Sequence, residues 1–321
     1  MTHWTASDIP SQRGRTAVVT GTGGLGFQDA LALARAGADV IIAGRNPAKG
    51  AAAVNEIRWK IPDANVAFGL LDLASLASIQ LFAEGLRNSR SKLDILVNNA
   101  AVMTPPTRRA TPDGFELQWG TNYLGHFALT AQLLPLLRNS NQARVITLSS
   151  VAARAGAIDF GDLQAERSYR PMSAYSQSKL ACLMFALELQ RRSDAAGWNI
   201  QSIAAHPGIS RTDLLPNGAG AWSVAGMVRR FMWFLFQPAE QGALPTLFAA
   251  TSPLARGGNY YGPDGLAEMR GYPTSAAIPP QALDIGAAAR LWSASEALTR
   301  TVFRDESKMS DAFHDVHRLP A

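Results

Sequence analysis

The sequence predicts an α/β fold, a doubly wound parallel sheet of about seven strands with helices on both faces. Short β-branched runs alternate with amphipathic helical stretches through the first third of the chain, which is typical of parallel βαβ units. The run at residues 94–97 is short and apolar on both faces, as strands buried in a parallel sheet are. No internal repeat or low-complexity linker divides the 321 residues, so one domain is the simplest interpretation.

The elements follow one another in a regular order. Strands are expected at residues 16–20, 40–43, 65–70, 94–97, 143–148, 199–204 and 259–261. Helices are expected at residues 28–36, 47–60, 75–87, 173–193 and 285–299, with two more within 113–138. Gly37 ends the first helix, because glycine readily adopts the left-handed conformation that closes a helix. Beyond Gly208 the periodicity weakens, and residues 210–237 suggest a flap over a pocket.

The composition indicates a folded globular protein with a sizeable core. Hydrophobic residues make up 47% of the chain and charged residues 17%, which excludes a disordered chain. The net charge of +5 is modest, and the lysines and arginines are scattered rather than gathered in a stripe. This pattern indicates a mild attraction for anionic ligands, and no nucleic acid is expected as a partner.

Cysteine usage and the first residues bear on the cellular compartment. The single cysteine, Cys182, excludes an internal disulfide, and its apolar neighbours indicate a buried, unreactive thiol. Residues 1–14 contain no basic stretch followed by an apolar run, so no secretory signal is expected. We therefore predict a cytoplasmic protein.

One apolar segment, residues 221–236, raises the question of a membrane. Arg229 and Arg230 interrupt it, and it is shorter than the roughly 20 residues that span a bilayer. No transmembrane span is therefore expected. The run at residues 231–236 has three interpretations: a core helix, an apolar lid over a lipophilic substrate, or a peripheral membrane contact helped by the two arginines.

A glycine-rich loop, Gly21-Thr22-Gly23-Gly24-Leu25-Gly26, follows the first strand and opens the first helix. Glycines let the backbone turn tightly and approach a pyrophosphate, which the helix N-terminus then stabilises. Because the loop lies between a strand and a helix in the first βαβ unit, we predict that it binds a dinucleotide. A plain glycine-rich turn is the alternative.

The residues after the second strand, Gly44-Arg45-Asn46, bear on which nicotinamide cofactor is used. An acidic side chain here would bind the 2′-hydroxyl of NAD and repel a 2′-phosphate. Arg45 offers instead a planar guanidinium that suits a phosphate. The sequence thus favours NADP(H) over NAD(H), the alternative being that Arg45 is an exposed loop residue.

Tyr175 and Lys179 are four residues apart on a predicted helix, which places them on one face of it. A free phenol has a pKa near 10 and is a poor acid or base at neutral pH. A nearby ammonium stabilises the phenolate and brings it toward the working range. The pair can serve proton transfer, but the same spacing is common by chance.

Other motifs lie after predicted strands or within a predicted helix. They are Asn98-Asn99-Ala100-Ala101, Asn122 in the sequence Asn-Tyr-Leu-Gly-His-Phe, Ser149-Ser150, and His206-Pro207-Gly208. With this set, residues 14–262 resemble a short-chain dehydrogenase/reductase, and the motifs occur in that family's order. The chain is most similar to the retinol-dehydrogenase and protochlorophyllide-reductase branch, on account of Gly44-Arg45-Asn46, the long stretch between Ser150 and Tyr175, and Tyr260-Tyr261-Gly262-Pro263.

The resemblance implies a Rossmann-type fold and hydride transfer between NADP(H) and a carbonyl or alcohol carbon. It implies that Tyr175 is the general acid/base, and that Lys179 assists its ionisation and holds the nicotinamide ribose. Ser150 would bind the substrate oxygen, and Asn122 would hold a water in the proton relay. Ser149 competes with Ser150, and the second serine is preferred because it is the reacting one in the family's serine pair.

The resemblance also implies a set of cofactor contacts. They are Gly21, Gly23, Gly24, Leu25 and Gly26 in the loop, Arg45 and Asn46, Asp72 and Leu73 at the adenine, Asn98 and Ala100 on the adenosine ribose side, and Pro207, Gly208 and Thr212 at the nicotinamide amide and phosphate, besides Tyr175 and Lys179. Asp72 can instead cap the helix that follows it, and Asn98 can be a turn residue.

Two departures from the family pattern affect the cofactor site. The loop from Thr20 to Gly26 is one residue shorter than the family's usual glycine motif, which affects the geometry at the pyrophosphate. The motif after the fourth strand ends in Ala101 where the family usually has glycine. One added methyl group at that turn can shift the backbone near the cofactor.

The resemblance divides the chain into three parts. Residues 1–13 would be an N-terminal extension, 14–262 the NADP(H)-binding Rossmann domain, and 263–321 a C-terminal extension packed on or trailing the same domain. Residues 210–237 fall where the family has its substrate flap, which favours the lid among the three interpretations. Family members often form dimers or tetramers, so a homo-oligomer is expected by analogy.

Other chemistries are set aside. His314 and His317 have a ligand-like spacing but no nearby carboxylate or thiol cluster, so no metal is expected. His126 and His206 are interpreted as structural. The chain has no Gly-x-Ser-x-Gly sequence, which disfavours a hydrolase.

The sequence therefore predicts an NADP(H)-dependent oxidoreductase that acts on a lipophilic small-molecule carbonyl or alcohol. One alternative is a non-catalytic NADP(H)-binding sensor or scaffold, which would have no need of all four catalytic candidates. Another is a nucleotide-sugar epimerase or dehydratase with bound NAD. Phe27, where that class has a glycine, and Arg45 both argue against it.

Overall fold

A computed structural model describes residues 3–210 and 237–303 of the chain. Its strands are β1 Thr16–Thr20, β2 Asp39–Gly44, β3 Val66–Leu70, β4 Ile95–Asn98, β5 Ala143–Leu148, β6 Ile200–Ala205, β7 Tyr260–Pro263 and β8 Pro273–Ser275. Its longer helices are α1 Gly24–Arg35, α2 Pro47–Lys60, α3 Leu76–Ser89, α4 Gly125–Arg138, α5 Pro171–Ala196, α7 Ala239–Thr251 and α8 Ile285–Thr299. Shorter helical segments are η1 Ala6–Asp8, η2 Trp119–Leu124, η3 Val151–Ala155, η5 Leu266–Glu268 and η6 Pro280–Leu283.

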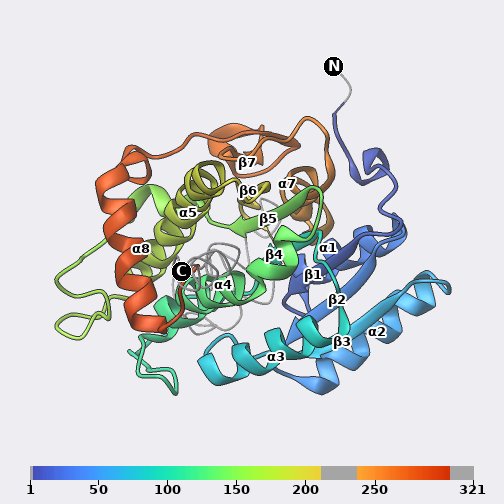
Figure 1. Cartoon of the computed structure of the whole chain (residues 1–321). Helices are drawn as coiled ribbons and strands as arrows, with labels where there is room; N and C mark the ends of the chain where they lie inside the picture. Colours follow the sequence, from blue (N-terminus) through green and yellow to red (C-terminus); the bar gives the residue numbers. More distant parts are fainter. Residues whose placement is uncertain (1–2, 211–236, 304–321) are drawn as a thin grey trace, which may run out of the picture.

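The described strands form one sheet in the order β3-β2-β1-β4-β5-β6-β7-β8 (Figure 1). Neighbours from β3 to β7 run parallel, and β8 pairs antiparallel with β7. The order reverses between β1 and β4, and ligands of such sheets bind outside the carboxyl ends of the strands at this switch point. The predicted doubly wound Rossmann-type fold is confirmed, with eight strands in place of about seven. The sequence does not predict β8, because three residues are too few to show an alternating pattern.

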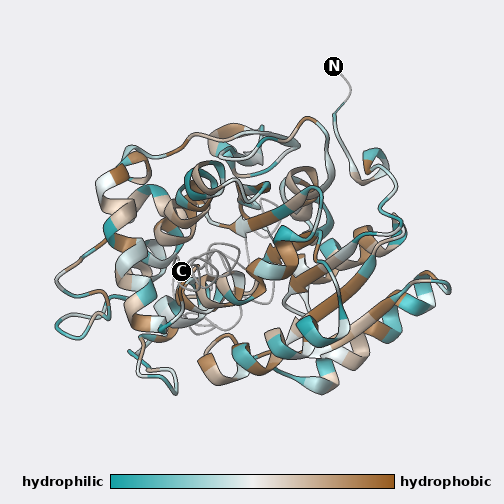
Figure 2. Cartoon of the chain, in the orientation of Figure 1, coloured by the Kyte–Doolittle hydropathy of each residue, from teal (hydrophilic) through white to brown (hydrophobic). Residues whose placement is uncertain are grey.

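Helices cover both faces of the sheet, and alternate strand residues point to opposite faces. In β1, Ala17 and Val19 pack with α1, α2 and α7, whereas Val18 between them packs with α3, α4 and α5. All three side chains are fully buried. The inner strands are mostly hydrophobic in Figure 2, while α2 and α3 mix hydrophilic and hydrophobic residues. This difference reflects strands buried on both faces and helices buried on one.

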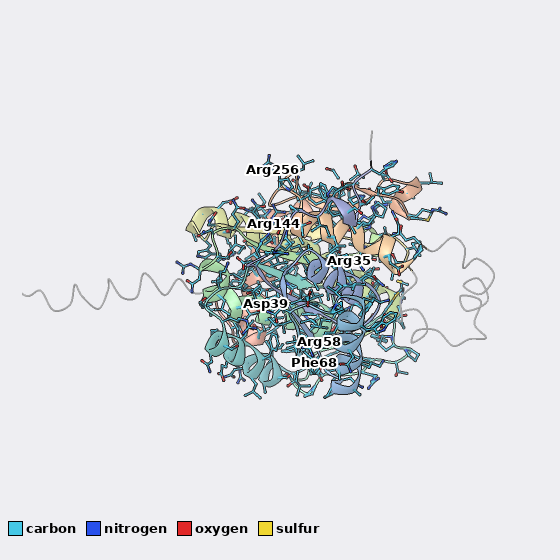
Figure 3. All side chains as sticks on the ribbon, turned by 90° about the vertical axis from the view of Figure 1, so that its right-hand side faces the viewer. Arg35, Asp39, Arg58, Phe68, Arg144 and Arg256 are labelled. Carbon is cyan, nitrogen blue, oxygen red and sulfur yellow. The ribbon has the colours of Figure 1, made fainter. Side chains whose placement is uncertain are left out.

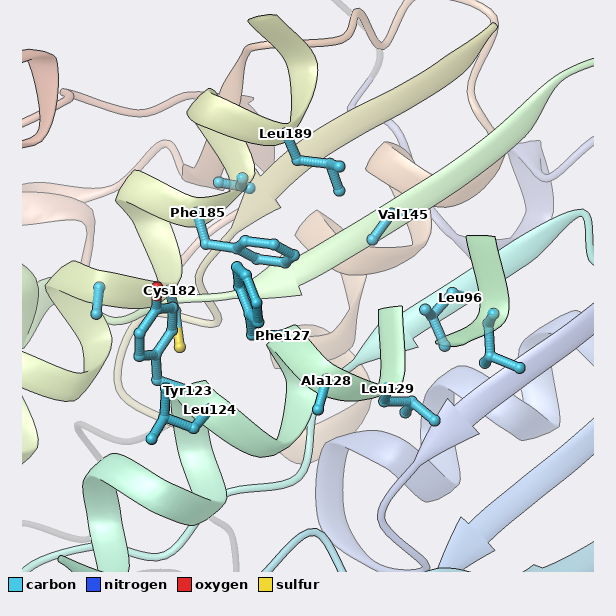
Figure 4. Close-up of a cluster of buried hydrophobic side chains, with 14 of the residues drawn as sticks. Leu96, Tyr123, Leu124, Phe127, Ala128, Leu129, Val145, Cys182, Phe185 and Leu189 are labelled. Atoms are coloured by element: carbon cyan, nitrogen blue, oxygen red, sulfur yellow. The ribbon is translucent and has the colours of Figure 1, made fainter. Parts of the chain in front are cut away.

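An aromatic cluster fills the core beside α4 and α5 (Figure 4). The rings of Phe127 and Phe185 lie 5.5 Å apart, and Trp292 of α8 lies 5.8 Å from Phe185. The segment that follows β8 therefore contributes to the same core. Cys182 is buried in this cluster, as its apolar neighbours predict.

Two helical regions differ from the expectations. Residues 113–116, where a helix is expected to begin, instead form a turn and a bridge between Ala110 and Glu116, and helical structure begins at Leu117. The π-helix η2 then leads into α4. The helix α7 is not predicted from the sequence, because Pro245 lies inside it and its apolar residues show almost no helical periodicity.

The amino ends of the strands are held together by charged side chains. Asp94 accepts hydrogen bonds from the Thr16 amide at 2.8 Å, the Ser140 hydroxyl at 2.6 Å and the Lys92 ammonium at 3.2 Å. Burial alone would raise the pKa of Asp94, but these donors together hold it below its ordinary value.

Arg144, labelled in Figure 3, lies at the same edge of the sheet at the start of β5. It donates to the carbonyls of Ala249 at 2.9 Å and Ser252 at 2.8 Å and so closes the C-terminal end of α7. Burial lowers the pKa of its guanidinium to about 10, which still leaves it charged at neutral pH.

No helix among the described residues is long and apolar enough to cross a membrane. The apolar run at residues 231–236 and nearly all of the expected flap at 210–237 lie outside the described residues. The same is true of His314 and His317.

Candidate active site

The glycine-rich loop closes tightly between β1 and α1. Gly21 has a φ of +102°, and a Cβ placed on it would lie 2.8 Å from the Asn99 side-chain nitrogen. A Cβ on Gly26 would lie 2.5 Å from the Gly21 carbonyl oxygen, so no larger residue fits at either position. No side chain caps the N-terminus of α1. Its first-turn amides are thus available to an anion, and the residues present fit a pyrophosphate.

Thr20 ties this loop to the end of β4. Its hydroxyl oxygen accepts from the amides of Asn99 at 2.9 Å and Ala100 at 3.0 Å, and the Asn99 side chain donates to the Thr20 carbonyl at 2.7 Å. Asn98 behaves differently, because its buried amide donates to Thr130 of α4 at 3.1 Å. Asn99, rather than Asn98, therefore reaches the glycine loop. The alternation of side chains along a strand is the only sequence signal that separates them.

Arg45 and Asn46 lie beside the same loop. A Cβ on Gly44 would lie 2.7 Å from a methyl carbon of Thr22, so the end of β2 touches the loop. Arg45 is exposed and forms no ion pair within the described part of the chain. The Asn46 side chain accepts from the Lys49 amide at 3.0 Å and caps α2. The Arg45 side chain is therefore free to meet a ligand, while that of Asn46 has a structural role.

Asp72 and Leu73 follow β3. The Asp72 carboxylate accepts from the Ala74 amide at 3.0 Å, and Ser75 rather than Asp72 caps α3. Leu73 is buried, and its carbonyl lies so close to Gly125 that a Cβ there would come within 2.3 Å. The contact fixes the start of α4 against the turn after β3.

Tyr175 and Lys179 lie on α5, where both side chains are buried. The Lys179 ammonium donates to the Leu148 carbonyl at 3.0 Å, and the Ser149 hydroxyl donates to the Lys179 carbonyl at 2.8 Å. The Tyr175 hydroxyl has no hydrogen-bond partner within residues 3–210 and 237–303. These two hydrogen bonds attach α5 to the end of β5. Beside them, the Tyr175 hydroxyl is not bound by any described residue.

The two serines after β5 have different environments. Ser149 is buried, and its hydroxyl hydrogen is used on Lys179. Ser150 is half-buried, and its oxygen accepts from the Ala152 amide at 3.2 Å as the N-cap of η3. The hydroxyl hydrogen of Ser150 therefore has no partner within the described residues. The two serines thus differ in hydrogen bonding, which the sequence alone does not show.

Asn122 lies in the π-helix η2, a distortion that often accompanies functional sites. Its side chain exchanges two hydrogen bonds with the Val102 backbone, at 2.8 and 3.0 Å, and donates to the Ser178 hydroxyl at 3.0 Å. Its carbonyl lies 2.9 Å from His126 Nδ1 and accepts from Cys182 Sγ at 3.2 Å. Asn122 thus connects α5, α4 and the loop after β4.

His126 connects this network to the glycine loop. Its Nδ1 faces the Asn122 carbonyl and must carry a hydrogen, while its Nε2 lies 3.0 Å from the Thr20 hydroxyl. Burial lowers the pKa of His126 to about 4, so the ring is neutral at physiological pH. A structural role for His126, as predicted, fits this position.

Pro207 and Gly208 follow β6. Gly208 has a φ of +62°, and a Cβ on it would lie 2.3 Å from the Met269 carbonyl oxygen. Beyond them, Ser210 and Gln237 form an isolated bridge. Thr212 lies outside the described residues. No group of His, Cys, Asp and Glu side chains in the described ranges is arranged to hold a metal ion.

The sequence profile of the short chain dehydrogenase family matches residues 15–219. The chain belongs to this family. Polyprenol dehydrogenase from Mus musculus is 41% identical to it over 270 residues, which cover 82% of this chain and 80% of that protein. Retinol dehydrogenase 13 from Homo sapiens is 41% identical over 291 residues, covering 89% of this chain and 84% of that protein.

Solved structures share the fold of this chain. The crystal structure of an uncharacterized protein from Mycobacterium Paratuberculosis has a TM-score of 0.79 and 42% identity, covering 95% of this chain and 100% of that one. Pseudomonas aeruginosa RhlG in complex with NADP has a TM-score of 0.61 and 27% identity, covering 78% and 94%.

This short-chain dehydrogenase is therefore an oxidoreductase of the retinol dehydrogenase branch, as the sequence motifs predict. The structure brings the glycine loop, Asn122, the serine pair and α5 to one edge of the sheet. The individual roles of these residues stay predictions. Sequence reasoning missed Thr20 and Asn99 as the link between β1 and β4, although both lie next to motifs that it used.

Proposed function

We propose that this short-chain dehydrogenase interconverts a lipophilic alcohol and its carbonyl with NADP(H), using Tyr175 as the general acid/base. The observation that carries the proposal is the Tyr175 hydroxyl, which no described residue binds and which lies on a largely buried side chain one helical turn from Lys179. The Lys179 ammonium and the Ser149 hydroxyl beside it both donate to backbone carbonyls. A phenol whose hydroxyl has no partner among the described residues suits a proton donor whose partner is the substrate oxygen.

The other residues of the site would hold the reacting groups. The free hydroxyl hydrogen of Ser150 would bind the substrate oxygen beside Tyr175. The positive charge of Lys179 would stabilise the phenolate and bind a ribose hydroxyl, and Asn122 keeps α5 in place through Ser178. Bound NADP(H) would supply or accept the hydride.

The cofactor would lie across the switch point between β1 and β4. The first-turn amides of α1 would bind the pyrophosphate, and Arg45 would bind the 2′-phosphate. Asp72, Leu73 and Ala100 would border the adenosine half, and Pro207 and Gly208 the nicotinamide. Support for NADP(H) over NAD(H) comes from the exposed Arg45, which forms no ion pair with any described residue, and from the lack of an acidic residue in the sequence directly after β2.

The relatives support a lipophilic substrate. Those with about two-fifths identity are named for retinol and polyprenol, which are both long isoprenoid primary alcohols. Because the chain shares most of its length with them, we propose an alcohol or aldehyde of this kind.

Steady-state kinetics test the cofactor and the substrate separately. With NADP⁺, wild-type protein should oxidise retinol or a short polyprenol and show little activity on ethanol. Arg45→Asp should lower kcat/KM for NADP⁺ by about 100-fold, since the loss of one charged contact is joined by repulsion of the 2′-phosphate. Arg35→Asp, a change of equal charge at the far end of α1, serves as the control. Equal kcat/KM values for NADP⁺ and NAD⁺ in the wild type would contradict the cofactor assignment.

A further inference from the structure

A half-buried carboxylate lies on the loop between β7 and β8. Glu268 accepts through Oε2 from His206 Nε2 at 2.8 Å and from Arg154 Nη2 at 2.5 Å. Its other oxygen accepts from the Ala277 amide at 3.0 Å. These three donors come from three different segments of the chain, so one side chain holds them together.

The protonation states of this cluster follow from its contacts. His206 is fully buried, and its Nδ1 accepts from the Gly208 amide at 3.2 Å, which leaves the hydrogen on Nε2. Burial lowers the pKa of His206, so the ring is neutral. The hydrogen bond from His206 lowers the pKa of Glu268 to about 2, so its carboxylate is ionised and paired with Arg154.

The backbone around Glu268 adopts an unusual conformation. Ala267 has a φ of 53° and Glu268 a φ of 58°, in the left-handed region that residues other than glycine rarely adopt. Such a conformation persists only where the surroundings determine it, and it is common at functional sites. Here the surroundings are the three hydrogen bonds of the carboxylate and the bond from the Ile209 amide to the Met269 carbonyl at 2.8 Å.

Two of the three segments joined by Glu268 carry residues of the candidate active site. His206 directly precedes Pro207 and Gly208, which would border the nicotinamide. Arg154 lies in η3, the turn that Ser150 caps. Tyr260 fills the space between them: its ring packs against His206 at 5.0 Å between centroids, and its hydroxyl donates to the Ser150 carbonyl at 3.4 Å.

We propose that Glu268 is a positioning residue that fixes the Pro207–Gly208 turn and the Ser150 turn relative to each other. The inference rests on the proposed function for the roles of those two turns. By this account the loop between β7 and β8 acts as a brace: it holds the two turns in place through the contacts of Glu268. A displacement of about 1 Å at reacting groups lowers rates strongly, so a brace of this kind affects catalysis without touching substrate.

Glu268→Gln tests the brace, because an amide cannot satisfy the same donors. Whichever way the amide is turned, its NH₂ group faces either the His206 Nε2 hydrogen or the Ala277 amide, and Arg154 loses its charged partner. A matched control is Glu188→Gln. Glu188 is a buried carboxylate bonded to two arginines, Arg191 at 2.8 Å and Arg192 at 2.7 Å, and lies about 13 Å along α5 from Lys179.

The first readout is backbone hydrogen exchange of the full chain without cofactor. In Glu268→Gln, the amides of Gly208, Ile209 and Ala153 should exchange about tenfold faster or more, as the loss of a charged hydrogen bond predicts. Arg154→Gln should speed the exchange of the Ala153 amide alone, and Glu188→Gln should leave the exchange rates of all three amides unchanged. Wild-type rates at Gly208 and Ile209 in Glu268→Gln would overturn the proposal. If that variant does not fold, the shorter carboxylate of Glu268→Asp replaces it, with the same expected and contradicting results.

The second readout is steady-state kinetics. Glu268→Gln should raise KM for the nicotinamide cofactor and lower kcat, each by about tenfold, while Glu188→Gln changes neither. A variant that loses thermal stability with unchanged KM and kcat would show a merely structural role and contradict the proposal. If the wild type reduces no nicotinamide, the proposed function fails, and the exchange rates still decide whether Glu268 braces the two turns.

Discussion

The two edges of the sheet use polar side chains in opposite ways. At the amino edge, Asp94 and Arg144 have their partners within the protein, and these contacts join strands and helices. At the carboxyl edge, the Tyr175 hydroxyl and the Ser150 hydroxyl hydrogen have no partner within the described residues, and no side chain caps α1. Satisfied groups stabilise the fold, whereas unsatisfied groups at a switch point are available to a ligand. Changes at the amino edge should therefore lower stability, and changes at the carboxyl edge should lower activity.

The largest effect is expected for Tyr175→Phe. Removal of the hydroxyl should lower kcat by about 10³-fold or more, since a positioned acid/base contributes roughly 10²–10⁴-fold. The thermal midpoint and the Kd for NADP⁺ should stay close to wild type, because the hydroxyl has no partner in the described protein to lose. Kinetics, calorimetry and cofactor fluorescence titration check the three quantities. A large fall in thermal stability would mean that the Tyr175 hydroxyl has a hydrogen-bond partner within the protein, and would contradict its role as a group free to bind substrate.

Asp94→Ala should show the opposite behaviour. It leaves the Thr16 amide, the Ser140 hydroxyl and Lys92 without their shared acceptor, so the free energy of unfolding should fall by about 3 kcal/mol. The folded fraction should keep its kcat, because Asp94 lies at the far edge of the sheet. Chemical denaturation and active-site-normalised kinetics measure both. Asp63→Ala, at an exposed position whose side chain makes no hydrogen bond or ion pair among the described residues, is the control that should change neither.

The pH dependence of stability provides a third test, through His126. The unfolded imidazole takes up a proton near its ordinary pKa of 6.5, while the buried ring does so only near 4. Stability should therefore fall as the pH drops from 6.5 to 4, by up to about 3 kcal/mol. His206 acts in the same direction, and Asp29, whose pKa burial raises, acts in the opposite one.

The contribution of His126 alone is isolated by comparison with His126→Gln. Urea unfolding at several pH values should give a shallower slope for the variant between pH 4 and 6.5. Identical slopes for the two proteins would show that His126 is not the buried neutral base described above.

The serine pair gives the finest comparison, since a hydroxyl hydrogen with a protein partner and one without lie next to each other at the carboxyl edge. Ser150→Ala should lower kcat by about 100-fold, as for a single hydrogen-bond donor to a reacting oxygen, and should lower the free energy of unfolding by about 1 kcal/mol through loss of the η3 N-cap. Ser149→Ala should lower the free energy of unfolding by about 1 kcal/mol, because its hydroxyl bonds to the Lys179 carbonyl. Kinetics and denaturation of both variants test the assignment, and the reverse pattern would make Ser149 the reacting serine.

Much of the fold could be predicted from local sequence. The β-branched runs and the glycine loop place β1 to β6 and the switch point, because those strands are buried and their helices amphipathic. The sequence could not predict α7, whose register is set by packing on α1, or β8, which exists only through its pairing with β7.

The site was predictable in its motifs and not in its contacts. Tyr175 and Lys179 are visible through helical spacing. The link from Thr20 through His126 to Asn122 joins residues about a hundred positions apart, so no local pattern reveals it. Glu268 is equally hidden, because its partners lie 62 and 114 positions earlier in the chain and meet it only in the folded protein.

The most direct test of the account follows a labelled hydrogen. Wild-type protein is incubated with NADP⁺ and retinol deuterated at the carbinol carbon, and the reduced cofactor is analysed by mass spectrometry. The account predicts that the reduced cofactor carries the deuterium in the wild type, and that Tyr175→Phe forms almost none of it. Reduced cofactor without deuterium, or an equal yield from Tyr175→Phe, would contradict hydride transfer at this site with Tyr175 as its acid/base.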